Sequence, residues 1–194
     1  TTGAPVIVLP TAGSFDSASP SISGGALYLA SNAEHKLRQV SPQDGNSWWT
    51  APFTMDGAFE GTPAIAYGKV YVTDNTSKLY AIDTTDGALA WSKAFVPLST
   101  SSATVAGGVV YTGNDKRIFA FDASTGALLW SYGVGIGANQ SVTVANGFLY
   151  VGVSGNSPFR RGLVAFALKG AADRKAAARP AVADLVPDRT LTPQ

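Results

Sequence analysis

The segment LYAIDTTDGALAW, from Leu79 to Trp91, returns about 40 residues later as IFAFDASTGALLW, from Ile118 to Trp130. Ala, Asp, Gly and Trp stand in the same register in both copies. A unit of this length is a single supersecondary motif and cannot bury its apolar face alone, so several copies must stack around a shared core. The repeat therefore determines the architecture that we expect for this chain.

A second pattern, two apolar strands around a tight turn, occurs four times. Its tyrosines recur at intervals of about 40 residues and are Tyr28, Tyr71, Tyr111 and Tyr150. Its turns are Gly24-Gly25, Tyr67-Gly68, Gly107-Gly108 and Asn146-Gly147. Glycine and asparagine tolerate the positive φ that two-residue hairpin turns require, so each copy predicts a β-hairpin.

Two more strands are expected after each hairpin, except in the last copy, which has only one. The third strands are expected over residues 36–40, 78–83, 117–122 and 162–168, and the fourth over residues 46–53, 88–95 and 127–134. Four-stranded antiparallel meanders repeated in series predict an all-β protein, a β-propeller of about four blades. A two-layer β-sandwich is the competing fold, but it would not require the tryptophan to return at a fixed phase.

The propeller is expected to span residues 1–168, and residues 169–194 form an Ala- and Pro-rich tail or linker. Residues 1–9 align with residues 124–132, a fourth strand, so we expect the N-terminal strand to complete the last blade. The sequence favours a piece of a larger ring of about seven or eight blades. Closure of four blades alone, or of two chains as a homodimer, remains open.

Composition and charge limit the function classes. A net charge of +1 creates no field that would attract nucleic acid. The chain has no cysteine, which excludes disulfides and thiolate sites and fits an extracytoplasmic location, periplasmic, secreted or at the cell surface. No apolar run approaches the roughly 20 residues of a transmembrane helix, so we expect no transmembrane segment.

The spacing Ala-x-Asp-x-x-x-Gly-x-x-x-Trp resembles the tryptophan-docking repeat of the pyrroloquinoline-quinone-like propellers. The residues that match it are Ala81, Asp83, Gly87 and Trp91, then Ala120, Asp122, Gly126 and Trp130, and in a partial first copy Gly45 and Trp49. The resemblance implies that each Trp docks between adjacent blades. The family includes quinoprotein alcohol dehydrogenases, the propeller lipoprotein of the bacterial outer-membrane barrel assembly machinery and extracellular scaffold domains, so the resemblance implies the fold and leaves the chemistry open.

No catalytic residues are predicted. The single histidine, His35, lies in a polar turn, and a Ser/His/Asp set would require both partners beside it. Calcium would need about six to eight converging oxygens. Asp74-Asn75, Asn114-Asp115 and Asn32 with Glu34 fall in equivalent turns, but these residue types are also what tight turns prefer. No metal site or cofactor is therefore predicted.

A loop face is the expected binding surface, since loops on a rigid scaffold commonly carry function. Its candidate residues are Phe59, Glu60, Asp74, Asp115, Phe159, Arg160 and Arg161. An aromatic ring beside paired guanidiniums suits a carboxylate-bearing ligand or a protein partner. The sequence favours a non-enzymatic propeller module that binds a protein or a small polar ligand. The alternative is a fragment of a quinoprotein dehydrogenase that uses pyrroloquinoline quinone and calcium.

Overall fold

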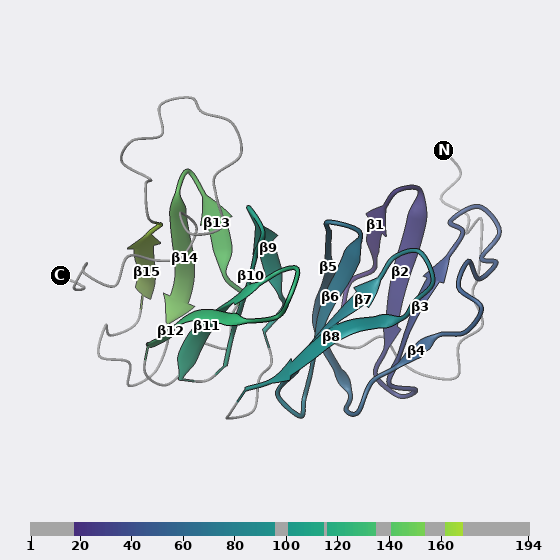
Figure 1. Ribbon diagram of the computed structural model, residues 1–194, viewed down its shortest axis with the longest axis horizontal. Helices are drawn as coiled ribbons and strands as arrows, with labels where there is room; N and C mark the ends of the chain where they lie inside the picture. The colour runs from purple at the N-terminus through teal and green to yellow at the C-terminus, as the bar shows by residue number, and fades with distance from the viewer. Residues whose placement is uncertain (1–17, 96–100, 115, 135–140, 154–161, 169–194) are drawn as a thin grey trace.

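The computed structural model describes residues 18–95, 101–114, 116–134, 141–153 and 162–168, and these form antiparallel β-sheets (Figure 1). The first sheet contains β1 (Ser21–Ser23), β2 (Ala26–Ser31), β3 (Lys36–Val40) and β4 (Phe53–Thr54). The second contains β5 (Phe59–Ala66), β6 (Lys69–Asp74), β7 (Lys78–Asp83) and β8 (Leu89–Ala94). The third contains β9 (Thr104–Ala106), β10 (Val109–Gly113), β11 (Arg117–Asp122) and β12 (Leu128–Gly133). The fourth contains β13 (Thr143–Ala145), β14 (Phe148–Val153) and β15 (Gly162–Ala167).

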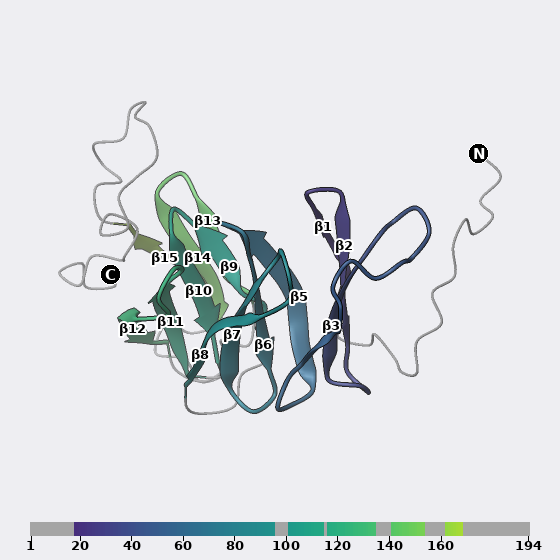
Figure 2. The ribbon, with the colours of Figure 1, turned by 45° about the vertical axis from the view of Figure 1, so that its right-hand side comes forward.

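Within each sheet the strands follow one another in chain order as a meander. The first strands β1, β5, β9 and β13 contact one another in sequence, and the sheets fan outward from them (Figures 1 and 2). This arrangement confirms the predicted all-β fold of propeller blades. No described residue lies in a helix, so none of the described segments could cross a membrane as a helix.

The hairpin turns have the predicted geometry. Tyr67 and Gly68, between β5 and β6, have φ values of 54° and 70°. Asn146 and Gly147, between β13 and β14, have φ values of 52° and 79°. Positive φ at both central residues matches the right-handed twist of the flanking strands, which explains why these residue types occupy the turns.

The fourth strand of the first sheet differs from the prediction. A continuous strand was expected over residues 46–53, but only an isolated bridge between Val40 and Ser47 and the short β4 form. The hydroxyl of Ser47 donates to the carbonyl of Trp49 at 2.7 Å, which bends the chain, and Pro52 has no N–H to donate. The ladder resumes where Phe53 pairs with Leu37, and it ends where Met55 N donates to the carbonyl of His35 at 2.8 Å.

Trp49 and Trp91 lie at junctions between successive sheets. The indole Nε1 of Trp49 donates to the carbonyl of Thr84 in the second sheet, and that of Trp91 to the carbonyl of Ala123 in the third, both at 3.1 Å. A Cβ atom on Gly87 would lie 2.8 Å from the ring of Trp49, closer than real contacts allow. The glycine of the repeat therefore accommodates the tryptophan of the preceding sheet.

The alanines of the repeat lie opposite its tryptophans. Ala81 pairs with Trp91 across β7 and β8, and Ala120 pairs with Trp130 across β11 and β12. Both alanines have no exposed surface, and Trp130 is also buried. A small side chain at this position leaves space for the large ring beside it.

The aspartates of the repeat bind the corner that follows β7 and β11. The Oδ1 atom of Asp83 accepts from the backbone N of Thr85, and that of Asp122 from the backbone N of Thr125, each at 2.8 Å. Gly87 N donates to the carbonyl of Asp83 at 3.0 Å, and Gly87 has a φ of 79°. The repeat thus specifies a turn that presents its glycine to the neighbouring sheet.

Candidate functional site

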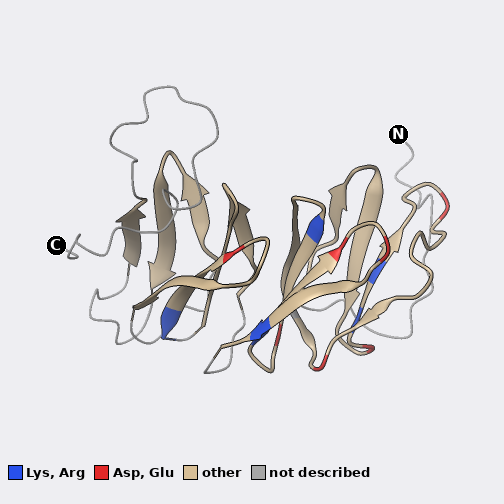
Figure 3. Cartoon of the chain, in the orientation of Figure 1, with Lys and Arg blue, Asp and Glu red and all other residues tan. Residues whose placement is uncertain are grey.

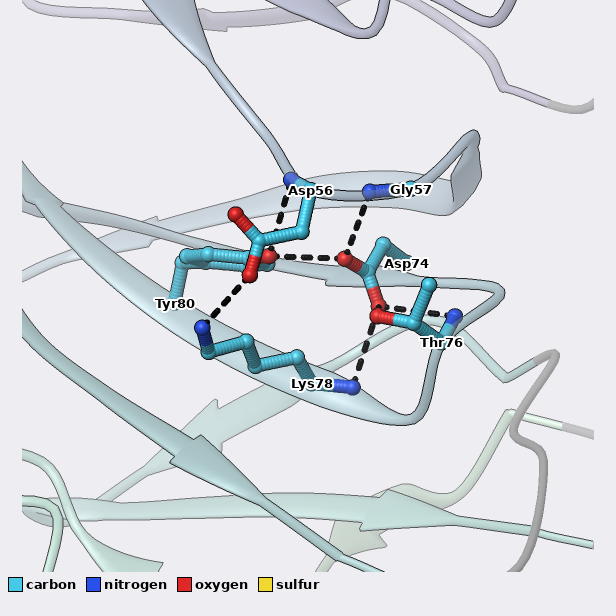
Figure 4. Close-up of polar contacts among 6 residues, drawn as sticks. All are labelled: Asp56, Gly57, Asp74, Thr76, Lys78 and Tyr80. Atoms are coloured by element: carbon cyan, nitrogen blue, oxygen red, sulfur yellow. Dashed lines mark hydrogen bonds and ion pairs between the residues drawn. The ribbon is translucent and has the colours of Figure 1, made fainter.

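The turn between β6 and β7 is built around the carboxylate of Asp74 (Figure 4). Its Oδ1 accepts from the backbone N of Thr76 and of Lys78, each at 3.0 Å, and from the Thr76 hydroxyl at 2.7 Å. Its Oδ2 accepts from the backbone N of Gly57 at 3.1 Å and from the hydroxyl of Tyr80 at 2.7 Å. Asp74 has no exposed surface, so its carboxylate is buried and makes these five hydrogen bonds with groups of the protein.

The same turn joins this sheet to the segment before β5. The amide oxygen of Asn75 accepts from the backbone N of Ala58 at 3.0 Å, and Asn75 N donates to the carbonyl of Ala58 at 2.9 Å. A Cβ on Gly57 would clash with the amide oxygen of Asn75. Gly57 therefore permits the close approach that brings its N–H to Asp74.

Polar side chains occupy the equivalent position in the first and third sheets. Asn114 follows β10, and its amide oxygen accepts from the backbone N of Lys116 at 3.0 Å and of Arg117 at 2.7 Å. Ser31 ends β2 and is fully buried, and its hydroxyl lies 3.4 Å from the backbone N of Glu34. Capping the turn between the second and third strands is thus a shared structural role.

An ion pair lies beside the Asp74 turn. Lys78 Nζ is 2.6 Å from Asp56 Oδ2, and it lies over the ring of Tyr80 at 5.5 Å from the centroid. The hydrogen bond from Lys78 holds the pKa of the Asp56 carboxyl below its usual range. Burial, together with the hydrogen bond to Asp74, raises the pKa of Tyr80, so its phenol stays protonated at neutral pH. Asp56 is the exposed member of this group, with 63% of its side chain accessible.

Phe59 requires a correction. It was expected in an exposed connector, but it begins β5, pairs with Asp74 and is completely buried in the core. β5 begins at Phe59, earlier in the chain than expected, because a bulge between Glu60 and Ala64, with Gly61 at a φ of 90°, joins the two parts of the strand. The side chain of Phe59 lies in a buried cluster with Val72 and Tyr80 and offers no surface to a partner.

The side chains of the other candidate residues lie outside what the structure describes. Glu60 lies on β5, and its side chain is outside what the structure describes. Asp115, Phe159, Arg160 and Arg161 lie outside the described residues. The role of these residues as a binding face therefore stays a prediction.

The side chains of the described turns do not form a calcium site. Calcium is held by carboxylate and carbonyl oxygens that converge on one point. The oxygens of Asp74 and the amide oxygen of Asn114 accept turn N–H groups instead. Within the described ranges, no group of three His, Cys, Asp or Glu side chains could hold a metal ion. Charges of both signs are scattered over strand ends and turns, as Figure 3 shows.

Sequence reasoning missed the group formed by Asp56, Lys78 and Tyr80. Asp56 is 18 residues from Asp74 along the chain. The hydroxyl of Tyr80 links them, because it accepts from the backbone N of Asp56 and donates to Asp74, and this link forms only in the folded sheet. One signal was present, because strand alternation places the phenol of Tyr80 toward the interior, where its hydroxyl needs a partner. Asp74, at the end of the neighbouring strand, is that partner.

The sheets and their repeat define a propeller of the pyrroloquinoline-quinone-like class. The chain belongs to the family of the outer membrane protein assembly factor BamB, whose family model matches residues 8–155. No curated protein sequence matches the chain significantly.

Solved structures show the same fold at low identity. BamB from Moraxella catarrhalis is 20% identical with a TM-score of 0.65, and the match covers 78% of this chain and 49% of that one. A quinohemoprotein alcohol dehydrogenase, ADHIIG, from Pseudomonas putida HK5 is 21% identical with a TM-score of 0.64, covering 73% and 28%. The computationally designed Ika4 protein is 12% identical with a TM-score of 0.71, covering 86% and 99%. The chain thus spans about half of the BamB structure.

Proposed function

We propose that this chain is a non-catalytic, extracytoplasmic propeller module that binds a protein partner through its loop face. The loop face comprises the turn between the second and third strands of each sheet and the segments packed against it, and Asp56, Asn75 and Thr76 are exposed on it. The family match carries the proposal, because the family is named for a factor in the assembly of outer membrane proteins.

The chemistry of the Asp74 turn supports a binding role over a catalytic one. All five hydrogen bonds to its carboxylate fix backbone and side chains of the turn. A general base or a metal ligand would need a lone pair directed at a substrate or an ion. A rigid turn that presents the exposed Asp56, paired with the partly buried Lys78, suits recognition of a charged protein surface.

The remaining candidates extend this face. We propose that Glu60, Asp115, Phe159, Arg160 and Arg161 contribute to it, because they lie in or beside the same class of turn in the sequence. The paired guanidiniums would recognise carboxylates of the partner. A small polar ligand is the other occupant that this chemistry would accept.

Site-specific crosslinking tests the proposal. A photoreactive amino acid replaces Asp56 in the full-length protein, and a matched variant carries it at Leu89, which is 48% exposed on β8. We expect a discrete protein adduct from position 56 and none of the same mass from position 89, in the cell that makes the protein. Equal adducts from both positions, or none from position 56, would contradict a loop-face interface.

A cofactor titration tests the dehydrogenase alternative, which draws support from the likeness to quinohemoprotein alcohol dehydrogenases. Pyrroloquinoline quinone and calcium are added to the full chain. We expect no change in quinone absorbance and no rise in melting temperature. A saturable spectral change with substrate-dependent dye reduction would favour the dehydrogenase.

A further inference from the structure

One position in the fourth strand of each sheet distinguishes the second junction, between the second and third sheets, from the first junction, between the first and second sheets, and the third, between the third and fourth. The position is defined by its cross-strand partner on the third strand of the same sheet. It is occupied by Phe53, Lys93 and Tyr132, which pair with Leu37, Leu79 and Ile118, respectively. The repeat thus places an aromatic ring here in two sheets and a lysine in the sheet between them.

At the two aromatic junctions the ring covers the neighbouring sheet. Phe53 packs edge-on against Tyr80 of the second sheet, with ring centroids 5.7 Å apart. Tyr132 packs edge-on against Phe166 of the fourth sheet, with centroids 5.1 Å apart. Such contacts add stability beyond the buried area, so each ring closes its junction.

At the second junction a pocket of about 350 Å³ lies where that ring would be. Phe95, Phe119 and Phe121 line it, and all three are at least nine-tenths buried. Phe95 lies 5.1 Å from Phe119 and 6.1 Å from Phe121 between ring centroids. Phe95 therefore covers part of this aromatic wall, and the position that a ring fills at the two counterparts is taken by Lys93.

Lys93 lies at the edge of this pocket. Its Cε is 3.1 Å from the Cβ position of Gly126, so its aliphatic stem crosses the β11–β12 corner. Lys93 is exposed and forms no ion pair with any residue in the described ranges. Leu128, on the third sheet, also lines the pocket and is 57% exposed. One cationic group thus stands beside an open apolar cavity.

We propose that this pocket binds a small aromatic carboxylate. The ring of the ligand takes the place that Phe53 and Tyr132 fill at the other junctions, against Phe119 and Phe121. Its carboxylate pairs with the ammonium of Lys93, which removes the one uncompensated charge at the rim. The site involves no residue of the Asp74 turn, so it stands independently of the proposed loop-face function.

Size and chemistry select this class of ligand. Cavities of about 150 Å³ suffice for benzene, so this pocket holds one ring with a short acidic chain. An aliphatic acid would lose the ring contacts, and a neutral aromatic would lose the ion pair. A ligand of this size with one exposed ion pair binds weakly, with a Kd on the order of 1 mM.

Nuclear magnetic resonance titration of the full chain with 3-phenylpropionate tests the site. We expect saturable shifts of the backbone amides of Ala94, Phe95, Gly126, Ala127 and Leu128. The neutral 3-phenylpropanamide and the aliphatic hexanoate should each bind at least about threefold more weakly. No saturation below about 20 mM, shifts confined to other residues, or equal binding of the amide would overturn the proposal.

Two substitutions at one position sharpen the test. Lys93→Phe restores the ring present in the first sheet, so it should fill the pocket and abolish saturable binding. Lys93→Met keeps a similar stem without charge and should weaken 3-phenylpropionate binding about threefold while leaving the amide unaffected. Lys116→Met, at another exposed lysine in the turn before β11, is the matched control and should bind as the unmodified protein does.

The variants also test whether a loss of binding comes from unfolding or from a non-specific effect of charge. The melting temperature of Lys93→Phe, measured beside that of Lys93→Met, shows whether a loss of binding reflects unfolding. If Lys93→Phe is folded and binds as before, the ligand does not occupy the pocket and the proposal is overturned. If Lys93→Met and Lys116→Met weaken binding equally, the charge of Lys93 has no specific role and the proposal is likewise overturned.

Discussion

The two ends of β7 use an aspartate in different ways. Asp83 ends the strand at a corner that the repeat specifies, and the next residue, Thr84, accepts the indole N–H of Trp49 from the preceding sheet. Asp74 precedes the strand in a turn that other copies fill with Ser31 or Asn114, and its bonds serve the loops of its own sheet. At the ends of β7, the repeated residues therefore mark a corner that contacts the neighbouring sheet, and the variable residue marks a turn of its own sheet.

The largest effect should come from breaking a junction between sheets. Trp49→Ala removes a ring that is 2% exposed and leaves a cavity against Gly87, so the free energy of unfolding should fall by about 4 kcal/mol. Its neighbour Trp48 is 51% exposed and provides a matched control, for which we expect a loss of about 0.5 kcal/mol or less. Urea denaturation measures both, and similar losses would contradict the assignment of the junction to Trp49.

Breaking the non-repeated turn should cost less than breaking a junction. Asp74→Ala leaves buried donors of Gly57, Lys78 and Tyr80 without their acceptor, so we expect a loss of about 3 kcal/mol. Asp56→Ala removes only a solvent-screened ion pair and should leave the free energy of unfolding nearly unchanged. Equal losses in urea denaturation would indicate that the burial of Asp74 has no energetic consequence.

Two glycine-to-alanine substitutions separate the energetic cost of backbone strain from that of a contact between sheets. Gly126 has a φ of 69°, and its added Cβ would lie 2.7 Å from the ring of Trp91. Gly24 has a φ of 58° with no atom within 4 Å of its added Cβ. Both alanine variants bear the cost of positive φ, about 1 kcal/mol, but Gly126→Ala should lose about 2 kcal/mol more. Thermal or urea unfolding that gives equal losses would remove the steric argument.

The smallest effect concerns pH. Hydrogen bonds from Thr85 lower the pKa of Asp83, so its contribution to stability is present above the unfolded pKa of about 3.9 and is lost as pH falls through the lower folded value. Because this carboxylate lies near the surface, we expect less than about 1 kcal/mol. The loss of stability between about pH 7 and pH 2 should be smaller in Asp83→Asn than in the unmodified protein. An unchanged loss would contradict this role.

The blades were predictable because their signals are local. The turn pairs Tyr67-Gly68 and Asn146-Gly147 specify their hairpins through the positive φ of the two residues themselves. A short stretch of sequence is therefore enough to predict each hairpin. The break in the fourth strand of the first sheet was not predicted, although Pro52 lies within it. Its cause is a local bond between Ser47 and Trp49, which competes with the ladder only in the folded geometry.

The candidate site was less predictable, because burial there depends on contacts distant in sequence. Phe59 and Asp74 were both singled out from their segments, yet they pair with each other inside the second sheet. An acidic residue in a turn is usually solvated, and only the approach of Gly57 and Tyr80 makes Asp74 an internal anchor. The pocket at Lys93 could be found only by comparing the registers of three folded sheets.

The described bonds between sheets join only neighbours in chain order. The hydroxyl of Ser21 donates to the carbonyl of Pro63 at 2.7 Å, Thr62 N donates to the hydroxyl of Ser102 at 2.9 Å, and the Thr104 hydroxyl donates to the carbonyl of Val142. Among the described sheets, the second and the third therefore each have a stabilising neighbour on both sides. Amide hydrogen exchange should consequently be slow in β6, β7, β10 and β11.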